Sequence, residues 1–188
     1  SASPIVVTQN NLPVGAAKFF DMGQLSQVSA SSFNGSATIS AVESGTSTPA
    51  NIVASVLELS TNADAASSFE GVTGGSNTVY MASALCNAFG ASSAYAVQNT
   101  SSSATATVTV TYSNSNGSGS EVANIAPGAK RSFLGCTANN AGYSGSATIT
   151  AVEQGTSNPA DIVAIGKIFG SGNSTAFVGA DTGSSMLA

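Results

Sequence analysis

Short stretches in which apolar and polar residues alternate dominate the chain. The clearest is ATATVTVTY at residues 104–112, where Thr alternates with Ala, Val or Tyr. A period of two that is rich in β-branched residues predicts a strand with one buried face. Asn116-Gly117 follows closely and is a strong signal for a tight turn.

Strand signals recur along the rest of the chain, and no segment shows the stripe of an amphipathic helix. Residues 62–71 and 83–93 have room for one helical turn each. Short strands separated by Gly, Pro and Asn predict an all-β antiparallel sandwich. Further strands are expected at 5–8, 16–20, 36–42, 52–59, 79–82, 95–98, 130–133, 146–152, 162–169 and 176–178.

One block of sequence occurs twice. Residues 34–54 read NGSATISAVESGTSTPANIVA and residues 144–164 read SGSATITAVEQGTSNPADIVA, with sixteen of twenty-one positions identical at an offset of 110. So dense and ungapped a match predicts a duplicated structural unit of the size of a small β-domain.

The two copies are unequal. Residues 12–20 parallel 125–133, and Ser67–Gly71 parallels Thr175–Gly179, but 94–120 has no counterpart in the first copy. We therefore expect two related antiparallel β-sandwich lobes, Ig-like or jelly-roll-like, of which the first is incomplete. The expected parts are an N-terminal extension (1–12), a truncated lobe (13–85) and a complete lobe (86–188).

An incomplete sandwich leaves strand edges open to another chain. The extended segment Ser3–Asn10 is the natural donor strand, through Ile5, Val6 and Val7. Donation to the next subunit would give a head-to-tail homopolymer. Two intramolecular alternatives remain: the copies merge into one larger sandwich, or the N-terminal strand completes its own domain.

The composition favours an extracellular location. Only 7% of residues are charged, the net charge is −5, and the cations are Lys18, Lys130, Arg131 and Lys167. The chain thus has no basic footprint for nucleic acid, and no apolar run reaches membrane-spanning length. The first residues, SASP, fit a secreted chain whose signal peptide has been removed, the alternative being the boundary of an expressed segment.

The two cysteines, Cys86 and Cys136, predict one disulfide in a secreted chain, the alternative being two buried free thiols. Four N-x-S/T sequons fall in predicted turns and are candidate glycosylation sites. They begin at Asn34, Asn99, Asn116 and Asn173.

Catalytic chemistry is not expected. The chain has no His, so Ser-His-Asp and Cys-His arrangements are excluded. The repeated Glu43 and Glu153 are interpreted as turn residues rather than a cation site, and no calcium-loop or phosphate-loop spacing occurs. We expect no catalytic residue, metal or cofactor.

The segments AVQNTSSSATATVTVTYSNSNG (96–117), IAPGAKRSF (125–133) and GYSGSATITAV (142–152) resemble repeat modules of secreted bacterial cell-surface proteins. The resemblance implies an extracellular β-sandwich and no particular activity. The extended N-terminus and incomplete sandwich also look like subunits of donor-strand-exchanged, pilus-like filaments. The expected function is therefore a structural filament subunit. The alternatives are a monomeric adhesin or carbohydrate-binding module with surface glycans or other cells as partners, and a surface-layer or capsid protein.

Overall fold

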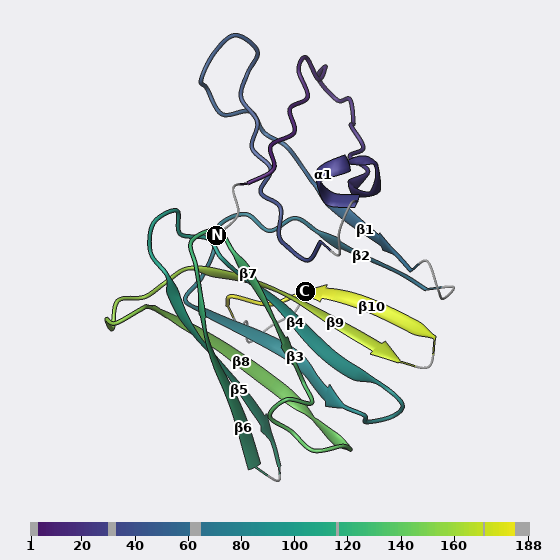
Figure 1. The fold of residues 1–188 in the computed structure, drawn as a ribbon, viewed down its shortest axis with the longest axis vertical. Helices are drawn as coiled ribbons and strands as arrows, with labels where there is room; N and C mark the ends of the chain where they lie inside the picture. The colour runs from purple at the N-terminus through teal and green to yellow at the C-terminus, as the bar shows by residue number, and fades with distance from the viewer. Residues whose placement is uncertain (1–3, 30–32, 61–64, 116, 171, 183–188) are drawn as a thin grey trace. The chain divides into compact units, whose positions relative to one another are not determined.

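The computed structural model describes residues 4–29, 33–60, 65–115, 117–170 and 172–182. The fold is all-β with antiparallel sheets, as predicted, and it divides into two compact units, Ser1–Val53 and Ala54–Ala188 (Figure 1). These units do not follow the predicted limits at 12 and 85, because the strands between Ala54 and residue 85 associate with those that follow.

The second unit contains all the strands found among the described residues. They are β1 (Ser55–Leu59), β2 (Ala66–Glu70), β3 (Thr78–Cys86), β4 (Ser92–Asn99), β5 (Ala106–Asn114), β6 (Gly117–Ile125), β7 (Lys130–Leu134), β8 (Tyr143–Glu153), β9 (Ile162–Gly170) and β10 (Asn173–Val178). β2 and β6 were not predicted. Residues 66–70 lie within the segment expected to hold a helical turn, and 117–125 is too polar to signal a strand alone.

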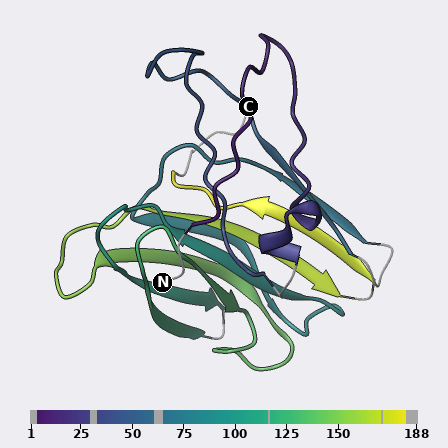
Figure 2. The same ribbon diagram turned by 45° about the horizontal axis from the view of Figure 1, so that its top comes forward.

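Eight strands form a two-layer sandwich. One sheet has the order β10-β9-β4-β7, and the other has the order β3-β8-β5-β6 (Figures 1 and 2). The chain crosses between the layers after β3, β4, β6, β7 and β8. The predicted strands β4 and β5, although consecutive, therefore lie in different sheets.

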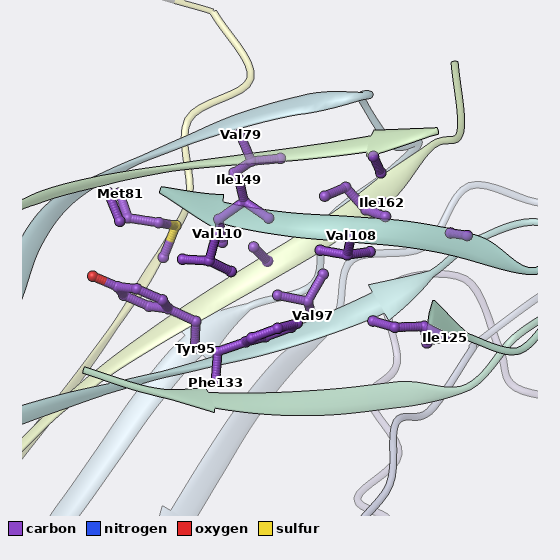
Figure 3. Close-up of a cluster of buried hydrophobic side chains, with 14 of the residues drawn as sticks. Val79, Met81, Tyr95, Val97, Val108, Val110, Ile125, Phe133, Ile149 and Ile162 are labelled. Atoms are coloured by element: carbon purple, nitrogen blue, oxygen red, sulfur yellow. The ribbon is translucent and has the colours of Figure 1, made fainter. Parts of the chain in front are cut away.

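Alternate residues of the strands fill the space between the two sheets. Tyr95 and Val97 of β4 face Val108 and Val110 of β5, and Phe133 enters from β7 (Figure 3). All are buried. The Thr–Val alternation that predicted β5 thus places its Val side chains inside, as a period of two requires.

Cys86 and Cys136 form the predicted disulfide, with a sequence separation of 50 and 4.7 Å between their Cα atoms. Cys86 ends β3 in one sheet, and Cys136 follows β7 of the other. The bond therefore ties the two layers together.

The first unit contains a 3-10 turn, η1 (Met22–Gln24), and one helical turn, α1 (Ser26–Ser29). Its described residues contain no strand, so the predicted strands at 5–8, 16–20 and 36–42 are wrong for this structure. A strand requires a neighbour for its backbone N–H and C=O groups, and within these residues only the bridge between Val42 and Pro49 forms.

Candidate assembly site

The second copy of the repeated sequence turns sharply between β8 and β9. Glu153 N donates to Asn158 O at 2.9 Å, and Thr156 Oγ1 donates to Glu153 O at 3.1 Å. Asn158 N in turn donates to Thr156 Oγ1 at 3.0 Å. Gly155 has a φ of +77°, a conformation that glycine adopts without strain.

The first copy folds into the same turn although its flanking residues form no sheet. Glu43 N donates to Thr48 O at 2.9 Å, and Thr46 Oγ1 donates to Glu43 O at 3.1 Å. Thr48 N donates to Thr46 Oγ1 at 3.1 Å, and Gly45 has a φ of +77°. The repeated sequence therefore encodes this turn locally.

The two repeated glutamates belong to the turn through their backbones. The carboxylate of Glu153 accepts a hydrogen bond from Asn158 Nδ2 at 3.1 Å, whereas Thr48 stands at the equivalent place beside Glu43. Within the described residues, no group of three or more acidic, Cys or His side chains is placed to hold a metal ion.

The hairpin of β1 and β2 has the register of the β9–β10 hairpin. Val56 pairs with Phe69, as Gly166 pairs with Phe177. The strands are closed by equivalent bonds. Gly71 N donates to Ala54 O at 2.8 Å, and Gly179 N donates to Ala164 O at 2.9 Å. The alignment of 67–71 with 175–179 therefore also describes the backbone geometry.

The two copies of the repeat differ in how far their equivalent side chains are buried. Ile149 of β8 is fully buried, while its counterpart Ile39 is 56% exposed. Likewise Ile162 of β9 is 1% exposed and its counterpart Ile52 is 42% exposed. The same residues thus stand inside a sandwich in one copy and in solvent in the other.

The outer edge of β1 has no partner among the strands that the structure describes. Ser60 N donates to Ala65 O at 3.0 Å, and Gly71 N donates to Ala54 O at the other end of the hairpin. These two bonds fix the alternation along β1 between residues whose backbone groups point toward β2 and residues whose backbone groups point away from it. That alternation turns the backbone groups of Leu57 away from β2. Among the described strands, only β2 pairs with β1, and every side chain of β1 is exposed. β1 is therefore an open edge, which is a template for an added strand.

A small polar cluster holds the β1–β2 hairpin near β9. Lys167 Nζ lies 2.7 Å from Glu58 Oε1, and Ser67 Oγ donates to Glu58 Oε2 at 3.2 Å. These groups line a small hollow together with Leu59 and Ser174.

The predicted donor residues Ile5, Val6 and Val7 are exposed and lie outside any strand. Of the sequons, Asn34 and Asn173 are exposed, and Asn116 lies outside the described residues.

Asn99 is fully buried, and this contradicts its assignment as a glycosylation site. Its Nδ2 donates to Ala104 O at 2.8 Å and to Ile125 O at 3.0 Å, and its Oδ1 accepts from Ser101 N at 3.0 Å. Both amide hydrogens are thus used inside the fold. Sequence inspection missed this role, since a turn Asn and a buried Asn look alike in a sequence.

Tyr95 and Tyr112 carry the most perturbed acid–base equilibria of the sandwich. Burial raises the pKa of Tyr95 to about 12, and its Oη donates to Ser83 O at 2.6 Å. Burial, reinforced by the Glu121 carboxylate that accepts from Tyr112 Oη at 2.7 Å, also holds the pKa of Tyr112 above its usual range. Both remain neutral at physiological pH and act as hydrogen-bond donors.

Comparison with protein-family models, curated proteins and solved structures finds no match for this chain. Neither helical turn of the described chain has the length or apolar character needed to cross a bilayer.

Proposed function

We propose that this chain is a structural subunit of an extracellular, pilus-like filament, assembled by β-strand complementation between copies. In this proposal residues 12–71 form a truncated copy of the sandwich that a neighbour completes. The observation that carries it is the contrast between Ile149, buried in the sandwich, and Ile39, exposed in the same sequence context. Burial of such a side chain contributes about 1.5–3 kcal/mol, so the exposed copy favours association.

The donor in this proposal is the segment at residues 5–10. It ends in Gln9-Asn10, as β4 ends in Gln98-Asn99. β4 pairs with β9. In the first copy, the residues that align with β9 include β1. The segment therefore suits the open edge of β1, with Val7 opposite Ser55 and Ile5 opposite Leu57.

The same register assigns faces to the donor. Val6 takes the position of Tyr95, whose side chain is buried between the sheets, and Gln9 takes that of Gln98, which faces outward. Val6 is a large apolar side chain exposed to solvent in the first unit. A neighbouring sheet would bury Val6 and leave Gln9 in water.

The chemistry of the surface supports an extracellular setting. The disulfide is compatible with an oxidising compartment, and few residues are charged. In such a fibre, backbone hydrogen bonds between strands of neighbouring subunits hold the subunits together, and the hydroxyl-rich faces are exposed to solvent.

Negative-stain electron microscopy of the purified protein tests the proposal. The chain should form fibres, and a chain lacking residues 1–10 should remain as dispersed or amorphously aggregated subunits. Val6→Asp should also abolish fibres, while Gln9→Glu, a control in the same segment, should preserve them. Normal fibres from the deletion would contradict the proposal. Two-dimensional sheets would favour a surface-layer protein, and a monomer with saturable glycan affinity would favour an adhesin.

A further inference from the structure

We infer that the donor of the proposed assembly has two strands, and that residues 17–20 follow residues 5–10 onto the neighbouring subunit. We call these two segments together the donor hairpin. The inference rests on the proposed function and deepens it, because it names the whole part of the partner that the open edge of β1 receives. The partner is a second copy of this chain.

The complete copy of the sandwich shows where the second segment belongs. In its sheet, β4 lies between β9 and β7. Residues 17–20 align with residues 130–133 of β7, within the alignment of 12–20 with 125–133. A donor strand in the position of β4 therefore has an outer edge at which residues 17–20 add as the next strand.

The register of the donor hairpin follows from that of β4 and β7. Tyr95 is opposite Phe133, and the corresponding residues of the first copy are Val6 and Phe20. Tyr95 and Phe133 are 0% and 2% exposed, whereas Val6 and Phe20 are 81% and 36% exposed. Pairing places both apolar side chains on the face that the complete copy buries.

The turn before the second segment already has the conformation of its counterpart. Ala16 N donates to Pro13 O at 3.0 Å, and Ala129 N donates the equivalent bond at the same distance. Gly15 has a φ of +73°, and Gly128 has a φ of +66°. The alignment therefore describes backbone geometry as well as sequence, and a preformed turn lowers the ordering cost of binding.

The loop between the two segments is short enough for a hairpin. In the complete copy, β5 and β6 stand between β4 and β7, and the first copy lacks residues that correspond to them. Asn99 N donates to Ala129 O at 3.0 Å, so the equivalent bond would join Asn10 to Ala16. The remaining loop, residues 11–15, has a length common in β-hairpins. β4 and β7 are antiparallel, which is the orientation that such a hairpin gives.

The second segment is available for pairing. No hydrogen bond joins a backbone group of residues 17–20 to any other part of the chain that the structure describes. Phe19 is 76% exposed, and Phe20 is also among the exposed apolar residues. The segment ends at Asp21, whose Oδ1 accepts from Gly23 N at 2.9 Å and caps η1. An unpaired backbone with exposed aromatic side chains favours addition to a sheet edge.

Peptide inhibition of fibre growth by the full chain tests the inference. A peptide of residues 4–21 should inhibit growth, followed by light scattering, at a concentration at least about tenfold lower than a peptide of residues 4–11. The reason is that only the longer peptide brings the second strand and Phe20. Phe20→Asp in the longer peptide should remove this advantage. Phe19→Ser should retain it, because Ser132 holds the same place in β7 and is exposed.

Two variants of the full chain give an independent measurement by electron microscopy. Phe20→Asp should abolish fibres, because its charge would replace an apolar side chain on the buried face. Phe19→Ser is the matched control on the opposite face and should preserve fibres. Both residues lie in the first unit, so thermal unfolding of the second unit serves as the folding control.

Two outcomes would overturn the inference: normal fibres from Phe20→Asp, or a longer peptide that inhibits no better than the shorter one. If Val6→Asp still abolishes fibres, the proposed function stands with a single donor strand. Absence of fibres from the wild-type chain would instead reject the proposed function and the two-stranded donor together.

Discussion

The side-chain amide of Asn99 donates a 3.0 Å hydrogen bond to the backbone carbonyl oxygen of Ile125, joining the end of β4 to the end of β6. These two strands belong to different sheets. One buried polar side chain therefore links the two layers near the connections that enter β5 and β7.

We expect Asn99→Ala to destabilise the sandwich by roughly 2–4 kcal/mol, because it removes the hydrogen bonds that a fully buried side chain donates to the carbonyl groups of Ala104 and Ile125. Urea denaturation followed by circular dichroism measures the loss. Asn10→Ala is the matched control in the first unit, where the side chain is exposed, and it should change stability by less than about 0.5 kcal/mol. A loss below that value for Asn99→Ala would contradict the role assigned to the amide.

Removal of the disulfide should destabilise the second unit. The Cys86→Ser, Cys136→Ser double variant loses a cross-link between residues with a sequence separation of 50. The cross-link lowers the conformational entropy of the unfolded chain, so its loss should reduce the free energy of unfolding by about 3–4 kcal/mol. The denaturation midpoint of the double variant should fall to that of the wild-type chain measured under reducing conditions. Equal midpoints for oxidised wild type and double variant would show that the bond contributes nothing.

Alkaline pH should destabilise the sandwich through its buried tyrosines. The pKa of Tyr95 is raised from 10.0 to about 12, so above pH 10 the unfolded chain releases a proton that the folded chain retains. The contribution of Tyr95 to stability is therefore constant below pH 10 and falls between pH 10 and 12, by about 1.4 kcal/mol per pH unit.

The raised pKa of Tyr112 adds to this fall. Urea denaturation at pH 9, 10 and 11 measures the total slope, and Tyr95→Phe should reduce it. Unchanged stability from pH 9 to 11 would mean that the tyrosines ionise freely in the folded state.

The repeated turn offers a matched pair of glycine variants. Gly155 and Gly45 share a φ of +77°, which Ala adopts only at a cost of about 1–2 kcal/mol. Gly155→Ala should destabilise the second unit by that amount, because the turn connects β8 with β9. Gly45→Ala should leave the unfolding transition of the second unit unchanged. An equal loss for both variants would mean that the first turn unfolds together with the sandwich.

Much of the fold was predictable from local patterns. The alternation in residues 104–112 predicted β5, and the repeat predicted two equivalent turns whose hydrogen bonds agree closely. β6 was missed because its polar sequence acquires strand geometry only from the ladder to β5. The buried role of Asn99 was missed for a similar reason, since carbonyl groups 5 and 26 residues away supply its partners.

The sequence by itself determined the local conformations: the period of the strands, the turns at Gly45 and Gly155, and the pairing of the only two cysteines. Only the tertiary structure decided which isoleucine of the repeat is buried. Ile39 and Ile149 have almost the same neighbours in sequence, yet one is exposed and the other lies between two sheets. The reason is that burial depends on non-local strands, and the described first unit has no counterparts of β3, β5 and β6 to cover Ile39.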